Sequence, residues 1–182
     1  VGNSEDVHSI FREIYSHCDS LDVLVNNAGV AHIGLLMDLT DEEWRRIIDT
    51  NLSSVFYCCR EAVPKMVSTK SGRIINISSM WGTVGASCEA AYSASKSGIH
   101  GLTRALAKEL APSGIPVNAI ACGVIDTVMN AQLDKTERQE LAEEIPAGRF
   151  CSPEEIAEVI WQTANTPVYM TGQIIGVDGG YI

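Results

Sequence analysis

Apolar residues recur every three or four positions in two stretches near the start of the chain, which is the spacing of an amphipathic helix. The first stretch predicts a helix over 4–18, with Ser4 and Asp6 at its N-terminus. The second predicts a longer helix over 41–69, and "TDEEW" at its start matches a capping box. Similar patterns predict three more helices, over 89–111, 134–145 and 153–165.

Short apolar runs separate these helices, and each run ends in a polar or glycine-containing turn. The runs are "LDVLVNNAG", "GRIINISS", "IPVNAIA" and "GQIIGVDGG". Strands that alternate with helices of crossover length form a parallel sheet covered by helices on both faces. The sequence shows no internal repeat and no linker, so we expect one α/β domain over 1–182.

The composition adds an acidic charge balance. The 182 residues carry 13 lysines and arginines against 23 aspartates and glutamates, which gives a formal net charge of −10. Binding to nucleic acids or to anionic membranes requires a basic face, so we expect neither partner. No window approaches the roughly 18 consecutive apolar residues of a membrane span.

The six cysteines and four histidines show no metal-ligand spacing, and no C-x-x-C pair is present. Scattered thiols in a chain without an apolar N-terminal run are typical of reduced cysteines. We therefore expect a cytoplasmic protein without a metal site.

Candidate chemistry centres on "AAYSASKSG", where Tyr92 and Lys96 lie one helical turn apart. A nearby ammonium lowers the pKa of a phenol, although such a pair alone is more often a half-buried tyrosine beside a surface lysine. Two further polar residues change this balance. Ser79 ends a strand-like run, where a parallel sheet displays its functional groups, and Asn51 interrupts the apolar stripe of the long helix. Together they favour acid–base chemistry.

This combination resembles the short-chain dehydrogenase/reductase family over essentially the whole chain. Within that family the sequence is similar to 3-oxoacyl-(acyl-carrier-protein) reductases, and related sugar, steroid and alcohol dehydrogenases share many of its features. The resemblance implies a Rossmann-like parallel sheet with helices on both faces. The matching parts are "NNAG" at 26–29, Asn51, Ser79, Tyr92-x-x-x-Lys96, "VNAIACGVIDT" and the terminal "TGQIIGVDGG".

The resemblance also implies a role for each candidate residue. Tyr92 would give its proton to the substrate carbonyl, and Ser79 would hydrogen-bond the same oxygen. Lys96 would hold the nicotinamide ribose and lower the pKa of Tyr92. Asn51 would bend its helix and hold a water molecule. The cofactor-binding residues implied in this way are Asn27, Ala28, Tyr92, Lys96, Gly123, Ile125 and Thr127.

The function implied is the NAD(P)H-dependent reduction of a 3-oxoacyl thioester to the 3-hydroxyacyl thioester, with NADP(H) expected in preference to NAD(H). The substrate would be a small molecule or linked to acyl carrier protein, whose acidic surface needs basic residues such as Lys70 and Arg73 at the cleft. A dehydrogenase for a sugar or alcohol is the alternative within the same chemistry. A homodimer or homotetramer is expected through helices 41–69 and 89–111.

The chain departs from the family pattern in two places. No T-G-x-x-x-G-x-G phosphate-binding sequence is present, and 1–11 is similar to the segment after the family's third strand. We therefore expect the first three strands, about 60 residues, to be absent, which leaves a catalytically silent fragment as another alternative.

Cys122 replaces the usual proline before Gly123 and is either a packed cysteine or a reactive thiol. Substrate choice is expected to depend on 128–145.

Overall fold

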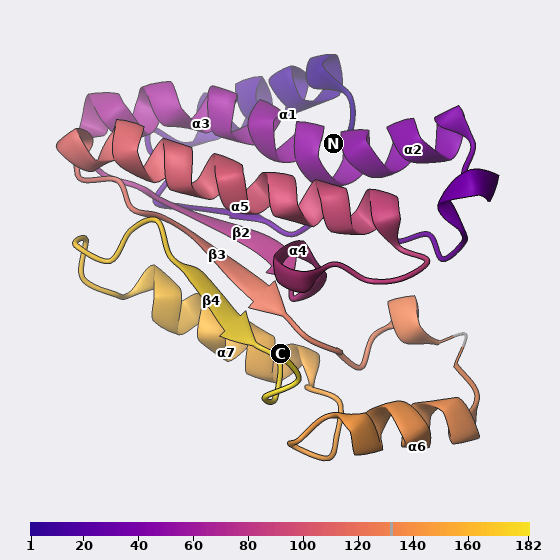
Figure 1. Cartoon of the computed structure of the whole chain (residues 1–182). Coiled ribbons are helices and arrows are strands. Elements are labelled where there is room, and N and C mark those ends of the chain that lie inside the picture. The colour runs from indigo at the N-terminus through magenta and orange to yellow at the C-terminus, as the bar shows by residue number, and fades with distance from the viewer. Residues whose placement is uncertain (132) are drawn as a thin grey trace.

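The computed structural model describes residues 1–131 and 133–182, and in this part of the chain four strands form one parallel sheet (Figure 1). The strand order follows the chain order, β1-β2-β3-β4. Every neighbouring pair is parallel, which confirms the expected sheet and places β1 at its edge. The strands are β1 (Val23–Asn26), β2 (Arg73–Ser79), β3 (Val117–Cys122) and β4 (Ile174–Val177).

Helices cover both faces of this sheet, as expected for an α/β fold. Figure 1 shows α1, α2, α3 and α5 over one face of the sheet and α7 over the other face. Helix α6 lies beyond the end toward which the strand arrows point. The α-helices are α1 (Ser4–His17), α2 (Asp41–Ile48), α3 (Ser54–Thr69), α4 (Trp81–Val84), α5 (Ala90–Leu110), α6 (Lys135–Glu144) and α7 (Pro153–Ala164). Short 3-10 turns lie at Leu36–Asp38, Ala111–Ser113 and Val128–Asn130.

The N-cap of helix α1 lies one residue before the expected start. Asn3, rather than Ser4, is the N-cap, and its side-chain oxygen accepts hydrogen bonds from the backbone N–H groups of Glu5 at 2.7 Å and Asp6 at 3.2 Å. Asparagine is as good an N-cap as serine because its short side chain reaches the free N–H groups of the first turn.

The expected long helix over 41–69 is interrupted. The capping box at its start is confirmed, because Thr40 and Glu43 exchange side-chain-to-backbone hydrogen bonds. A π-helical segment over Asp49–Ser53 then separates α2 from α3. Such a segment widens the helix by one residue per turn and is frequent at functional sites. Asn51 lies in the middle of it.

Two apolar clusters hold the layers together. The larger one fills the space between the sheet and helices α1, α3 and α5, and the smaller one lies beneath α7. Burial of this apolar surface is the main force that fixes the helices on the sheet. Buried members of the larger cluster include Val7, Phe11, Val55, Met66, Ile74, Ile99, Leu110 and Ile115, and those of the smaller one are Ile75, Ile120, Cys122 and Ile156.

The edge strand β1 is less buried than its apolar sequence suggests. Leu24 packs against the larger cluster, but Val23 and Val25 point to the other face and are 36% and 38% exposed. Helix α7 packs against β2 and β3 on that face, which leaves these valines uncovered by it. An exposed apolar edge of this kind favours pairing with another strand.

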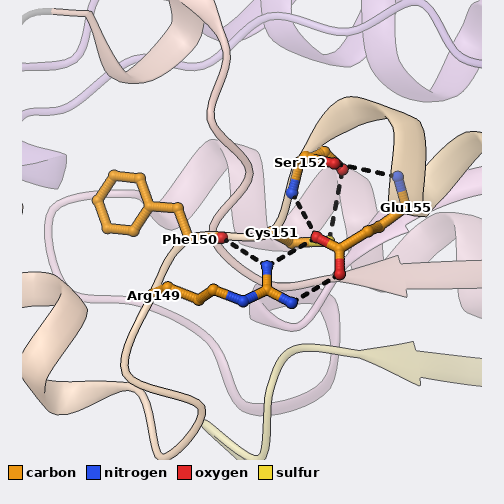
Figure 2. Close-up of polar contacts among 5 residues, drawn as sticks. All are labelled: Arg149, Phe150, Cys151, Ser152 and Glu155. Carbon is orange, nitrogen blue, oxygen red and sulfur yellow. Dashed lines mark hydrogen bonds and ion pairs between the residues drawn. The ribbon is translucent and has the colours of Figure 1, made fainter.

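The turn before α7 is held by a polar cluster (Figure 2). The Arg149 guanidinium donates to both carboxylate oxygens of Glu155, at 2.6 and 2.7 Å, and Ser152 caps the helix through a capping box with the same glutamate. The pKa of Glu155 is lowered to about 2, chiefly by the hydrogen bonds from Arg149. This cluster fixes where α7 begins and therefore how it lies against the sheet.

A chain of hydrogen-bonded polar side chains joins strands β1 and β2 to helix α5 on one face of the sheet. The Asn26 side chain on β1 donates to Asn76 on β2 at 2.8 Å, and Asn76 donates to the Thr103 hydroxyl on α5 at 2.9 Å. Asn76 is fully buried. Asn76 is the middle member, so removal of its amide would leave the Asn26 and Thr103 side chains each without one hydrogen-bond partner.

We expect Asn76→Leu to lower the free energy of unfolding by about 2–4 kcal/mol, because the side chains of Asn26 and Thr103 would each lose a partner. Urea denaturation measures this change. Thr136→Val on the exposed surface of α6 is the control and should change stability by less than about 0.5 kcal/mol. Equal stability of Asn76→Leu and the wild type would contradict this account.

Candidate active site

The candidate site lies where the parallel strands end together. β1 is followed by Asn27 and Ala28, β2 ends at Ser79, and β3 is followed by Gly123. Because the strands run in the same direction, these positions meet at one edge of the sheet, where open α/β sheets bind ligands. Backbone pairing of Ser79 with Cys122 fixes the alignment of the last two.

A cavity of about 630 Å³ opens at this edge. Ser79 lines it together with all seven residues for which cofactor contact was expected. Apolar side chains from α7, including Ile156 and Ile160, form the wall opposite Lys96. The expected residues that it brings together are Asn27, Ala28, Tyr92, Lys96, Gly123, Ile125 and Thr127.

A second cavity, of about 280 Å³, lies on the other side of Tyr92. Tyr92 and Ser79 line both cavities, as does Gly123. Tyr92 therefore contributes to the walls of both cavities. This second cavity was not foreseen from the sequence, because its lining comes from five separated segments of the chain.

Asn51 lies behind these cavities and connects three segments. It is fully buried in the π-helical segment, where its side-chain oxygen accepts from the Val30 N–H at 2.8 Å. Its amide group donates to the Val30 carbonyl at 2.9 Å and to the Ser95 hydroxyl at 3.1 Å. Asn51 thus fixes the loop after β1 to the helix that carries Tyr92 and Lys96, and it does so where its own helix deforms.

Lys96 is nearly enclosed. Its side chain is among the buried polar groups, with 4% of the residue exposed, and its ammonium donates to the Ile77 carbonyl on β2 at 2.9 Å. Burial disfavours the charged form and lowers the pKa of Lys96 to about 8. An amine in this state exchanges its proton near neutral pH far more readily than a surface lysine.

The pKa of Tyr92 differs from the expectation. Instead of being lowered by Lys96, it is raised to about 12, chiefly by burial and further by the Glu89 carboxylate, while a hydrogen bond with the Ser79 side chain lowers it in part. The Lys96 ammonium lies 5.5 Å from the centre of the Tyr92 ring and is directed to Ile77 instead. The effect of burial on the pKa of Tyr92 is therefore larger than any effect of the nearby Lys96 ammonium.

Two of the small residues near Tyr92 form hydrogen bonds that hold its helix in place. Ser95 donates to the Tyr92 carbonyl and accepts from Asn51. Ser97 donates to the Gly82 carbonyl at 2.7 Å. These side chains dock α5 against the π-helical segment and against α4, so they position Tyr92 from behind.

Comparison with known proteins identifies the family to which this chain belongs. A family model described as Enoyl-(Acyl carrier protein) reductase matches residues 1–182. The 3-oxoacyl-[acyl-carrier-protein] reductase FabG of Staphylococcus aureus is 42% identical over 181 residues, which cover 99% of this chain and 74% of that protein. FabG of Aquifex aeolicus is 40% identical over 179 residues, with 98% and 72% covered.

A solved structure agrees with these relatives. The crystal structure of an Agrobacterium tumefaciens protein assigned as a gluconate dehydrogenase superimposes with a TM-score of 0.91 at 34% identity, covering 99% of this chain and 72% of that one. The chain belongs to the short-chain dehydrogenase/reductase family. The resemblance seen in the sequence is confirmed, and with it an oxidoreductase that uses a nicotinamide cofactor.

The larger cavity fits the nicotinamide end of such a cofactor. Gly29 lines it beside Lys96 and Asn51, and a Cβ atom there would lie 3.5 Å from both the Lys96 amine and the Asn51 side-chain oxygen, which is ordinary contact. Lys96 and Tyr92 would supply donors for ribose hydroxyls, and Gly123 also lines the cavity. The residues present therefore suit this group.

Cys122, where the family usually has proline, is packed. It is 7% exposed, lies in the cluster beneath α7 and has its pKa raised to about 11 by burial. A thiol with this pKa stays protonated at neutral pH and is a poor nucleophile. The packed alternative is therefore the one that the structure favours.

Lys70 and Arg73 do not lie at the cleft, so this expectation was wrong. Lys70 ends α3 and Arg73 begins β2, whereas the site lies at Ser79, the other end of that strand. Six strand residues span about 20 Å. The segment over 128–145, expected to govern substrate choice, contributes Met129, Asn130 and other residues to the cavities, while residue 132 lies outside the described residues.

Two further features bear on the expected absences. None of the helices formed by described residues is long and apolar enough to cross a membrane. Within 1–131 and 133–182, no group of three or more metal-ligating side chains comes together.

We expect Lys96→Met to reveal the buried charge as a pH-dependent difference in stability. The folded chain releases the Lys96 proton near pH 8, while the unfolded chain holds it up to about 10.5. Between these values the unfolded state binds more protons, so the wild type gains stability relative to the variant as pH rises, by about 3 kcal/mol. Urea unfolding at pH 7, 8, 9 and 10 measures this gain, and a constant difference between the two proteins would contradict it.

Proposed function

We propose that this protein is a carbonyl reductase that converts a 3-oxoacyl thioester to the 3-hydroxyacyl thioester, with NADP(H) as the preferred cofactor. The observation that carries the proposal is the place of Tyr92, whose phenol stands in the wall shared by the two cavities. A cofactor in one cavity and a carbonyl compound in the other would both reach it. The bound cofactor supplies the hydride.

Tyr92 is suited to act as a general acid. With its pKa raised to about 12, the phenol remains protonated at neutral pH and holds a proton for the substrate oxygen. Ser79, which lines the same wall, would donate to that oxygen and stabilise the charge that develops on it. These two groups define where the carbonyl must lie.

Lys96 and Asn51 support this pair from behind. Lys96, with its pKa lowered to about 8, would hold the ribose hydroxyl groups and restore the proton that Tyr92 gives up. Asn51 is a positioning residue, because it contacts the loop after β1 and the helix that carries Tyr92 rather than a cavity. Its hydrogen bonds to Val30 and to Ser95 hold the loop after β1 at a fixed distance from α5.

Two other functions are alternatives to the reduction of a thioester. A dehydrogenase for a sugar or alcohol would use the same four residues, and the structural similarity to the protein assigned as a gluconate dehydrogenase favours it. The names of the sequence relatives favour the thioester instead. A catalytically silent chain that retains only an oligomer interface is the other alternative.

The first test is turnover of acetoacetyl thioester by the 182-residue chain, followed by NADPH absorbance. We expect activity with NADPH to exceed that with NADH, and Tyr92→Phe to lower kcat by about 10²–10⁴-fold because the general acid is removed. NADPH binding, measured by nicotinamide fluorescence, should weaken far less than kcat falls, because the Tyr92 hydroxyl is one of seven expected cofactor contacts. Tyr169→Phe, at a fully exposed tyrosine, is the matched control.

Each alternative has its own result in this test. Turnover of a sugar or alcohol without turnover of the thioester would replace the proposed substrate. Binding of neither cofactor would identify the silent chain. Full activity of Tyr92→Phe would remove the proposed acid from the mechanism.

We propose further that copies of this chain associate through the outer faces of α2, α3 and α5. Trp44, Phe56 and Val67 are large apolar side chains exposed on the first two of these helices, at 41%, 46% and 38%. Gly101 lies in the middle of α5, and a Cβ atom there would meet nothing within 4 Å. A glycine at an open helical position costs about 1 kcal/mol relative to alanine, so close approach of another helix would account for it.

We expect Gly101→Arg to dissociate the oligomer while the fold persists, because the side chain blocks close approach but fits the open helix surface. Sedimentation velocity should show a smaller species, and circular dichroism should be unchanged. Gln139→Arg on α6 adds the same charge away from this face and should leave the mass as in the wild type. An unchanged mass for Gly101→Arg would count against this interface.

A further inference from the structure

The smaller cavity holds a carboxylate that the proposed reaction does not use. Glu89 is the N-cap residue of α5 and lies three positions before Tyr92. N-cap side chains usually accept from the first free N–H groups of the helix, but the Glu89 side chain makes no such bond. Instead it lines the cavity on the far side of Tyr92 from Lys96.

Most of the residues that line the cavity with Glu89 are apolar, and the other polar ones are Ser79, Tyr92 and Asn130. Burial raises the pKa of its carboxyl group, and the charge of this carboxylate contributes to the raised pKa of Tyr92. Among the described lining residues, Tyr92 is the other titratable group, and none is basic. The apolar lining consists of Ala31, Ile33, Met80, Trp81, Val124, Met129, Leu133 and Leu141.

We propose that Glu89 is a specificity-determining residue that rejects substrates with a carboxylate near the reacting carbonyl and selects neutral esters, thioesters or amides. The proposal rests on carbonyl reduction at Tyr92 and adds to it the class of substrate. A donor on the substrate, such as an amide N–H or a hydroxyl, could meet the Glu89 oxygens. A second carboxylate could not, because no cation in the described wall would compensate it.

The size of the effect follows from the cavity. Two like charges a few ångströms apart repel each other, and the repulsion grows as water is excluded from between them. The apolar wall limits screening by water. About tenfold discrimination, which corresponds to about 1.4 kcal/mol, is therefore the least that we expect.

This inference separates the two proposed substrate classes. A 3-oxoacyl thioester is neutral around its carbonyl, and its acyl chain suits the apolar wall. A sugar acid or a free 3-oxo acid brings a negative charge into contact with Glu89. The cavity therefore favours the thioester over an acid of the gluconate type.

A matched pair of ligands tests the proposal, namely ethyl acetoacetate and acetoacetate, which differ in the charge beside the same 3-oxo group. Binding is followed at pH 8 by the fluorescence of Trp81, which lines the cavity, with Trp81→Phe to identify its signal. Reduction of both compounds with NADPH gives the ratio of kcat/KM. The proteins are the wild type, Glu89→Gln and the control Glu109→Gln, which removes one exposed charge from the distant end of the same helix.

In the wild type and in Glu109→Gln, we expect the ester to be preferred at least tenfold over the acid, in binding and in kcat/KM. In Glu89→Gln this ratio should fall below threefold. A ratio that is unchanged in Glu89→Gln, or that changes equally in Glu109→Gln, overturns the proposal. So does the absence of binding of both ligands at tens of millimolar.

The outcomes also distinguish this proposal from the reaction on which it rests. Binding discrimination that depends on Glu89 without reduction of either compound would retain the selectivity and reject the proposed function. Reduction of both compounds without dependence on Glu89 would do the reverse.

Discussion

The common direction of the four strands is the constraint on which the rest of the structure depends. Parallel pairing from β1 through β4 brings the ends of β1, β2 and β3 to one edge of the sheet. Residues that are far apart in the sequence, such as Asn27, Ser79 and Gly123, meet there in one cavity wall. The hydrogen bond between the Asn26 and Asn76 side chains favours this pairing of the first two strands, because another register would break it.

Burial sets the chemistry at this edge, and it acts in opposite directions on the two central groups. It lowers the pKa of Lys96 and raises that of Tyr92, because in each case the neutral form is favoured. The phenol is thus kept as a proton donor, and the amine is brought close to neutral pH. Exclusion of water also strengthens the interaction of the Glu89 carboxylate with other charges, which water would weaken.

Positioning is achieved from behind the cavities. The π-helical segment at Asp49–Ser53 places the Asn51 side chain where it reaches both the loop after β1 and Ser95 on α5. Ser97 fixes the other side of α5 to α4. The orientation of Tyr92 therefore depends on residues that contact no ligand cavity, which explains why small polar residues surround it.

Much of this could be predicted from the sequence, because it depends on local pattern. Hydrophobic spacing determined the helices and strands, the capping box determined the start of α2, and the placement of polar residues at strand ends determined which side chains meet. The tertiary structure alone decided the rest. The pKa of Tyr92, the packed state of Cys122, the distance of Arg73 from the site and the presence of Glu89 in a second cavity all depend on burial and on which chain segments surround a group. These are properties of the assembled layers, and spacing along the chain does not encode them.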